Sequence, residues 1–471
     1  MAHTTGLVRL LRRMALVTLV GVAVVLPAAA QAPDAFRLPD YVGLNELGEI
    51  ILTPEAAARW ATERNTQVRI QEQAVPAAEG QLQQARAADE LTVDASASAV
   101  VMGPVNTVTL PGEEGEDPVS FEVSPDQQYQ ATVSATKPLY TGGRAGLGED
   151  IAREGIGAAQ WGTEVAKLSV AQAARAAGYG VLRAVQLAGV SAAQVTALAE
   201  HVQNAEALED AGVVPHFDVV QARTELSRSQ EQLISAQTII EQVKAQLRML
   251  LALPQELCLQ IADAPPPQMP AGDLPELIDA AQASRPEVRT AEASLRIAEL
   301  SRKLAARSRA ASIALTGSYS RQTEGGLGGG EYSWQVGVVA QKPIFDGGRK
   351  RGEVTSADAQ VAQAELALQQ TQEQVALEVV QAWLSVQEAQ ERITTAAQGL
   401  EEARERRRMA QLRYREGLAV GIEVIDADTA LAAAEASLVN AEYDRQLAVT
   451  QLRTAMGIID VTGSQQEVET Q

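Results

Sequence analysis

Four residues that could act on ions or polar solutes lie close to two glycine-containing turns. Asp218 follows the first turn, and Tyr414, Glu423 and Asp426 flank the second. In an assembly of several copies around one axis, such carboxylates would form rings, and carboxylate rings select cations or constrict a pore. Asp218 and Glu423 are also explained as first-turn residues of helices, where the helix dipole favours acidic side chains. The two interpretations are compatible, and we predict a gate or selectivity site at these four residues.

The residue types most used in catalysis and metal binding are sparse. His3, His201 and His216 have no ligand or triad partners at useful spacing, and Cys258 is the one cysteine, so it forms no intramolecular disulfide. There is no GxxxxGK phosphate loop, and the glycine-rich run at 325–330 opens no predicted helix. The sequence therefore predicts no catalytic residue, no metal site, no cofactor and no enzyme.

The elements that would position the acidic residues occur twice. The stretch KPLYTGGR at 137–144 recurs 205 positions later as KPIFDGGR at 342–349. The same offset aligns further positions without a gap over about 115 residues, which is the mark of an internal repeat. We assign a first repeat to 53–252 and a second to 275–457, with tip turns at 210–218 and 415–423.

Each repeat is predicted to contain one long helix and two helices of half that length. The long helices run 143–210 and 348–415, and their 68 residues correspond to ~100 Å at 1.5 Å per residue. Because two half-length helices stacked end to end match one long helix, each repeat should fill two parallel columns. The shorter helices are predicted at 53–88, with Thr53 as N-cap and a kink at Pro76, and at 218–251, 275–308 and 423–456.

The helices carry apolar residues at sevenfold spacing, which predicts coiled-coil packing. An ordinary soluble helical bundle would explain the same spacing. The two sets are Val219, Leu226, Leu233, Ile240 and Leu247, and Val361, Leu368, Val375, Ala382 and Ala389.

Two segments switch from helical period to strict alternation, which is typical of strands. One strand hairpin is predicted within about 91–139 and another within about 311–343, so the chain has four strands. Alternating apolar and polar residues over about ten positions are the pattern of an outer-membrane barrel, and only a closed barrel satisfies the backbone in lipid. Four strands cannot close, so several chains must contribute; a soluble sheet packed on the helices is the alternative. The predicted lipid-facing residues are Ile313, Leu315, Tyr332, Trp334 and Val336.

The remaining segments bear on localisation and partners. Residues 1–30 have the basic, apolar and small-residue regions of a signal peptide. Residues 31–52 are expected to form an extended arm, 253–274 a proline-rich equatorial linker and 458–471 a C-terminal tail. The formal net charge of −21 argues against nucleic acid as a partner.

Several motifs together resemble one known family. They are Leu52-Thr53-Pro54-Glu55-Ala56, the paired KPxxxGGR elements, Ser284-Arg285-Pro286-Glu287-Val288, Tyr414-x-x-Gly417 and Glu423-Val424-Ile425-Asp426-Ala427. Their order, spacing and duplication are similar to those of outer membrane efflux proteins related to the TolC channel-tunnel, over about 52–457. The resemblance implies a mixed, mainly α-helical fold: a homotrimer with a long coiled-coil α-barrel tunnel and a transmembrane β-barrel of twelve strands shared between protomers.

The resemblance also implies roles for the tip turns. Acidic positions matching Asp218, Glu423 and Asp426 narrow the periplasmic entrance in such proteins, and a tyrosine matching Tyr414 ties neighbouring helices. The tying arginine falls on Ala419 here, and a threonine position falls on Phe217, so the network should be thinner. The residues implied to contact a periplasmic adaptor are Gly212, Val213, Gly417 and Leu418.

The predicted function is a passive exit duct in the outer membrane of a Gram-negative-type cell, with a long periplasmic extension. It would serve a tripartite efflux or type I secretion system, with an adaptor and an inner-membrane pump as partners. The alternative is a soluble periplasmic coiled-coil scaffold or adaptor. The run Arg404 to Arg408 is expected to be a solvated or inter-helix-paired face, with adaptor contact as the alternative. The sequence does not indicate the cargo.

Overall fold

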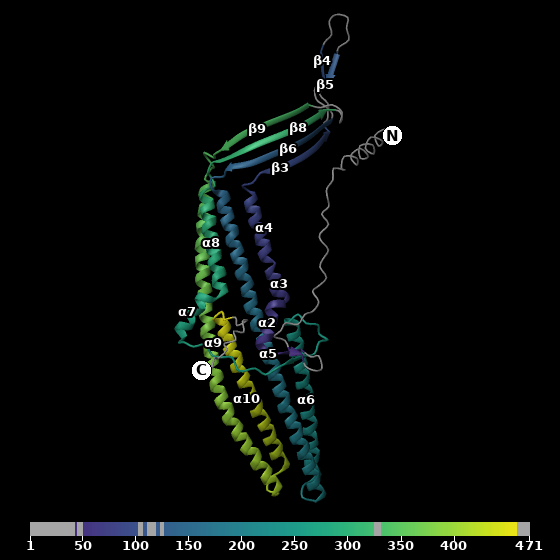
Figure 1. Cartoon of the computed structure of the whole chain (residues 1–471). Helices are drawn as coiled ribbons and strands as arrows, with labels where there is room; N and C mark the ends of the chain where they lie inside the picture. Colours follow the sequence, from purple (N-terminus) through teal and green to yellow (C-terminus); the bar gives the residue numbers. More distant parts are fainter. Residues whose placement is uncertain are drawn as a thin grey trace, which may run out of the picture. The chain divides into compact units, whose positions relative to one another are not determined.

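A computed structural model gives the structure of the chain (Figure 1). The predicted signal peptide at 1–30 lies outside the described residues, as does the predicted tail beyond Ile458. The structure describes residues 43–44, 50–101, 107–110, 119–122, 127–324 and 331–458.

One end of the helical body carries a four-stranded antiparallel sheet in the order β3-β6-β8-β9 (Figure 1). The first repeat supplies the β3–β6 pair and the second supplies β8–β9, which confirms one hairpin per repeat. The two hairpins join through a β6–β8 pair. The strands are β3 (Thr92–Val101), β6 (Gln127–Tyr140), β8 (Ser312–Glu324) and β9 (Glu331–Gln341).

Two smaller sheets were not predicted. The stretch expected to be a loop before β6 contains paired strands β4 (Thr107–Leu110) and β5 (Val119–Glu122). The expected arm and linker are joined in a three-stranded sheet by β1 (Gly43–Leu44), β2 (Ile50–Leu52) and β7 (Leu259–Ile261). Strands of two to four residues are too short to show a period, so the sequence pattern could not separate them from turns.

The long helices agree with the prediction. α5 (Arg144–Asp210) and α9 (Arg349–Arg415) have 67 residues each. Each begins after a glycine in the left-handed region, Gly143 at φ 73° and Gly348 at φ 92°, a conformation that costs glycine little. The return helices α6 (His216–Leu250) and α10 (Gly421–Ala455) have 35 residues each.

The helix predicted for 53–88 is instead three helices, α2 (Pro54–Arg64), α3 (Thr66–Glu72) and α4 (Ala74–Ala87). Thr53 caps α2 as predicted, because its hydroxyl accepts a hydrogen bond from the Ala56 amide. The kink predicted at Pro76 corresponds to the interruption at Gln73, three residues earlier. A proline donates no hydrogen bond to the carbonyl of residue i−4, which here is Glu72, the last residue of α3.

The helix predicted for 275–308 is also broken, into α7 (Leu274–Ser284) and α8 (Pro286–Ala306). The break lies at Arg285, which is extended at ψ 127°. The residue before a proline is disfavoured in the helical region, and Pro286 imposes this on Arg285.

The breaks at Asn65 and Arg285 are equivalent positions of the two repeats. α2, α3 and β3 begin 220 positions before α7, α8 and β8, because the first hairpin is longer than the second. The Asn65 amide donates to the Leu250 carbonyl at 2.8 Å, and the Arg285 guanidinium donates to the Thr454 and Ala455 carbonyls at 3.3 Å.

A neighbouring side chain completes each contact. Trp60 Nε1 donates to the Leu251 carbonyl at 2.9 Å, and Ser284 Oγ donates to the Met456 carbonyl at 2.6 Å. In both repeats the entering helices thus supply partners to the last carbonyls of the return helix, which have none within their own helix. We call these two sets of contacts the helix joints.

The half-length helices follow one another along each long helix (Figure 1). α5 packs against α2 to α4 on its sheet half and against α6 on its tip half, and α9 packs against α7, α8 and α10. The residues at sevenfold spacing in α6 and α9 are buried or half-buried, which confirms the predicted seams. Within the described chain, α5 is also apolar enough over 18 residues to cross a membrane by length and composition alone, which is weak evidence by itself.

Candidate functional site

The register of the sheet separates its side chains into two faces. Directly opposed residues on antiparallel strands point to the same face. One such row is Ala95, Val133, Tyr319 and Trp334. The adjacent row is Asp94, Ser134, Ser318 and Gln335, on the opposite face.

Nearly the whole sheet follows this division. The five predicted lipid-facing residues all lie on one face, which we call the apolar face, and Tyr332 and Trp334 there are each 71% exposed. The rings of Tyr319 and Tyr332 stack at 6.5 Å between centroids. The apolar face also includes five residues that follow the same alternation in the sequence but were not among the predicted lipid-facing residues: Val93, Val101, Val133, Tyr319 and Val338.

A second group of exposed apolar residues lies where the strands give way to the long helices. Ile344 and Phe345 are 85% and 88% exposed, and Leu139 and Tyr140 are each more than half exposed. These residues belong to the repeated KPxxxGGR elements, so their aliphatic–aromatic pairing was visible in the sequence. Aromatic residues at both edges of an apolar band are typical of transmembrane barrels.

The opposite end of the helical body consists of the two tip turns. Gly212 and Gly417 have φ of 74° and 69°, so both glycines occupy left-handed turn positions. Val213 and Leu418, which follow them, are exposed, and so are Phe217 and Ile422 at the starts of the return helices. Each tip therefore presents a small apolar surface.

The predicted gate residues are only partly brought together. Asp218 lies against the first residue of α10, since a Cβ on Gly421 would be 3.4 Å from Asp218 Oδ2. Glu423 pairs with Arg413 at 3.2 Å, and Asp426 is exposed with no ion pair among the described residues. The structure thus places Asp218 at the meeting point of α6 and α10 but gives the other two carboxylates separate surroundings.

Tyr414 is buried, at 5% exposure, and its hydroxyl has no hydrogen-bond partner within the described part of the chain. Burial raises the pKa of Tyr414, and the negative charge of Asp218 adds to that effect. The Tyr414 ring packs against His201 with centroids 5.3 Å apart. Ala419, at the position of the expected tying arginine, packs against the cluster around Tyr414.

Sequence reasoning missed a buried polar cluster next to Tyr414. Asp428 is 4% exposed and accepts a hydrogen bond from Arg407 at 2.6 Å. Burial raises the pKa of Asp428, and the Arg407 charge opposes this. Burial lowers the pKa of His201, and the charges of Asp428 and Asp218 oppose this. The residues come from α5, α9 and α10, so only the fold brings them together.

The arginine run of α9 is mostly paired. Arg407 reaches Asp428 on α10, whereas Arg404 and Arg408 pair with Glu401 and Glu405 one turn earlier in α9. These contacts favour the prediction of a solvated and inter-helix-paired face.

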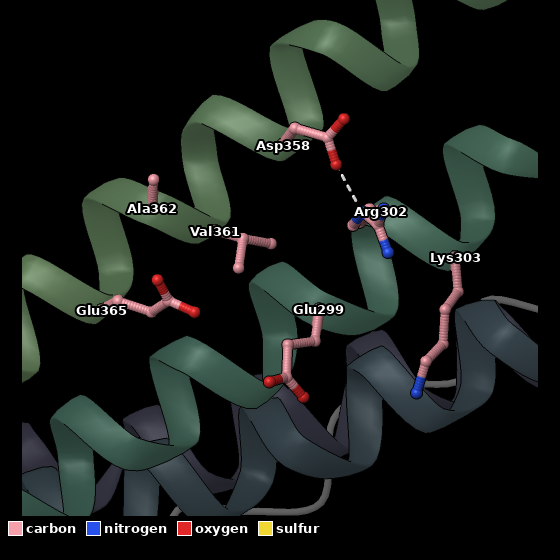
Figure 2. Close-up of a pocket in the computed structure, with 7 residues that line it drawn as sticks. All are labelled: Glu299, Arg302, Lys303, Asp358, Val361, Ala362 and Glu365. Atoms are coloured by element: carbon pink, nitrogen blue, oxygen red, sulfur yellow. Dashed lines mark hydrogen bonds and ion pairs between the residues drawn. The ribbon is translucent and has the colours of Figure 1, made fainter.

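Figure 2 shows an open depression between α8 and α9 on the sheet half of the body. Arg302 on α8 donates to Asp358 on α9, and Val361 points toward α8. The other lining residues are Glu299, Lys303, Ala362 and Glu365. No serine, threonine, cysteine or histidine lines the depression. Across the described ranges, no group of three or more histidine, cysteine or acidic residues is placed to hold a metal ion.

The chain matches a protein-family model over most of its length. The model described as outer membrane efflux protein matches residues 58–253 and 277–458.

Curated relatives are distant in sequence. An outer membrane efflux protein, BepC, of Brucella suis is 26% identical over 276 residues, which are 58% of this chain and 59% of that protein. The outer membrane protein OprJ of Pseudomonas aeruginosa is 29% identical over 177 residues, which are 37% of each chain. The matched part thus spans less than two thirds of either relative.

Solved structures share the fold over most of the chain. The outer-membrane channel OprN has a TM-score of 0.70 at 22% identity, and the match covers 86% of this chain and 89% of that one. The outer membrane protein VceC of Vibrio cholerae has a TM-score of 0.68 at 19% identity, covering 86% and 96%.

Proposed function

The chain belongs to the outer membrane efflux protein family, and we propose that it is a trimeric outer-membrane channel-tunnel. It acts as a passive exit duct of a tripartite efflux or type I secretion system. The strands form the wall of a barrel in the outer membrane, and the helices form a tunnel in the periplasm. The tip turns contact an adaptor, through which the duct docks onto an inner-membrane pump, and the acidic residues near the tips constrict the entrance.

The observation that carries this proposal is the two-faced sheet with two open edges. β3 and β9 each have one strand neighbour among the described elements, so both edges expose unpaired backbone groups. An apolar face this exposed fits lipid, and lipid requires that every backbone group be paired. Three copies of the chain would supply twelve strands and close the barrel.

The internal repeat indicates what covers each edge. A Cβ built on Gly142 would clash with the Ala310 Cβ, whereas no described atom lies within 4 Å of a Cβ built on Gly347 or Gly348. The two glycine pairs are equivalent, so a matching surface should cover the second pair. The residue of the first repeat that is equivalent to Ala310, 220 positions earlier, is Glu90, which lies just before β3 at the edge of the sheet. A second copy that pairs its β3 with β9 would bring its own Glu90 there.

The same mapping predicts the strand register between copies. Within one chain, Thr136 on β6 lies opposite Thr316 on β8. The 205-residue offset maps Thr136 onto Gln341, and the 220-residue offset maps Thr316 onto Ser96. Gln341 of one copy should therefore lie opposite Ser96 of the next, both on the polar face.

Disulfide crosslinking tests this arrangement. Gln341→Cys combined with Ser96→Cys, in a Cys258→Ser background, should give crosslinked dimers and trimers on non-reducing gels of outer membranes. The matched control combines Gln341→Cys with Ser98→Cys, which is displaced by two residues on the same face and should crosslink far less. Equal crosslinking in both pairs, or monomers in both, would contradict the proposed closure.

Adaptor docking rests on the exposed tips. Val213 and Phe217 on one tip are equivalent to Leu418 and Ile422 on the other, and all four are exposed apolar residues. An apolar surface at two equivalent turns suits a partner that contacts both. The names of the relatives, which include a solvent efflux pump outer membrane protein, support efflux as the process.

A further inference from the structure

The apolar face carries two cations within its strands, Lys137 and Arg321, and only one of them is paired. Lys137 Nζ donates to a Glu90 carboxylate oxygen at 2.9 Å and to the Asp89 carbonyl at 2.8 Å. Arg321 is exposed and forms no hydrogen bond or ion pair with any residue that the structure describes. A guanidinium is charged at all physiological pH values, so its counterion must come from elsewhere.

Among the described residues of the four strands, no carboxylate shares the face of Arg321. Its row across the sheet is Ala97, Ala131, Arg321 and Tyr332. The described acidic side chains of the four strands, such as Asp94, point to the polar face. The row thus places one unpaired cation between small alanines on one side and the stacked tyrosines on the other.

The position of Arg321 along the strand sets its depth. Lys137 lies opposite Leu315, six residues from Arg321 on β8, which is ~20 Å along the strand at about 3.4 Å per residue. Lys137 lies at the helix end of the sheet, so Arg321 lies near the end furthest from the helices. A long side chain there can extend its charge to the lipid headgroups while its stem stays in the apolar layer.

We propose that Arg321, with Tyr319 and Tyr332 beside it, binds the phosphate of a phosphorylated lipid headgroup in the leaflet furthest from the helices. The guanidinium matches phosphate geometry through paired N–H donors. The tyrosine rings supply the amphipathic surface found at membrane boundaries. This inference rests on the proposed membrane-spanning barrel and adds a lipid ligand to it.

The test measures lipid retained by the full-length protein. Wild-type protein is reconstituted into galactolipid vesicles that contain either diphosphoryl lipid A or its dephosphorylated form, then extracted in detergent. Retained lipid A per chain is counted by mass spectrometry. We expect wild-type protein to retain about tenfold more of the phosphorylated lipid, because a charge-assisted hydrogen bond is lost with the phosphate.

The variants assign that preference to one side chain. Arg321→Gln should lose the tenfold preference, and Arg321→Lys should keep part of it. Arg228→Gln is the matched control, since it removes an exposed arginine of α6 that pairs with Glu225 far from the sheet. Insertion and conductance are measured for each variant, so a folding failure is recognised.

The outcomes separate this inference from the proposed function. An Arg321→Gln channel that conducts and keeps the wild-type preference would overturn the lipid site alone, as would a conducting wild-type channel with no preference. A wild-type protein that never enters vesicles would overturn both.

Discussion

The sheet and the helix tips, at opposite ends of the helical body (Figure 1), hold their functional residues in different ways. The apolar face of the sheet is a surface to which each strand contributes every second residue. The tip contains a few specific contacts between helices, such as Tyr414 on α9 with His201 on α5, and Arg407 on α9 with Asp428 on α10.

This difference indicates how each end tolerates change. On the sheet, polarity matters more than identity, so a substitution that keeps the polarity of its face should be accepted. At the tip, partners matter, so removing one side chain leaves another buried without compensation. The four predictions below test this contrast.

The largest effect is expected on the sheet. Trp334→Asp places a carboxylate on the apolar face; an arginine or lysine on the lipid face at the bilayer midplane costs about 2–4 kcal/mol, and a carboxylate costs less but still disfavours insertion. The variant should fail to fractionate with outer membranes. Gln335→Asp, one residue along on the polar face, should insert normally. If both variants behave alike and the protein is extracted without detergent, the soluble scaffold or adaptor becomes the better hypothesis.

At the tip, Arg407→Ala should lower local stability, because it removes the ion pair between Arg407 and Asp428. It leaves the Asp428 carboxylate buried without its partner, at a cost of about 2–3 kcal/mol. Hydrogen–deuterium exchange across 400–430 should rise accordingly. Arg404→Ala, which removes only an exposed pair with Glu401, should change exchange little. Equal exchange in the two variants would show that the tip tolerates change as the sheet does.

Neutralising Asp218, Glu423 and Asp426 together, as Asn, Gln and Asn, should lower the cation preference of the channel several-fold. The physical reason is loss of negative potential at a constriction. Reversal potentials in planar bilayers measure the preference. Asp94→Asn on the polar face of the sheet serves as the control and should have a smaller effect. Unchanged selectivity in the triple variant would refute the acidic constriction.

The smallest effect should be a pH dependence at His201. Its pKa in the folded tip lies below the usual value of about 6.5, so the unfolded tip takes up the proton first as pH falls. The folded tip should therefore be fully stable above about pH 6.5 and lose stability below it. Asp428 and Tyr414, with pKa values raised, and the charges of Asp218 and Arg407 face the same cluster.

The measurement compares tip exchange at pH 7.5 and 5.5 in wild type and His201→Gln. Asp428 and the other neighbours are present in both proteins, so the difference between them reports mainly on His201. A drop in stability of equal size in both would assign the pH dependence to another group.

The sequence predicted the parts of this fold that depend on period and repetition. Alternation over ten residues defined β3 and β9, sevenfold spacing defined the packing of α6 and α9, and the 205-residue offset defined two equivalent halves. These signals are carried by many residues at once, so no single exception hides them.

What the sequence did not predict depends on single positions or on distant contacts. Asn65 breaks a helix because its side chain is held by the carbonyl of Leu250, 185 positions away. The environment of His201 depends on Asp428 and Tyr414, which no spacing rule connects to it. The gate residues were chosen by resemblance and by charge, and their roles remain predictions.

The helix joints have a mechanical consequence. The breaks at Asn65 and Arg285 lie beside uninterrupted stretches of α5 and α9. In each repeat, one continuous helix therefore spans the point at which the neighbouring column is interrupted. Bending the body at mid-height must strain a continuous rod. Moving the tips apart would instead require each return helix to shift relative to its helix joint. The hydrogen bonds of Asn65 and Arg285 would then resist that movement.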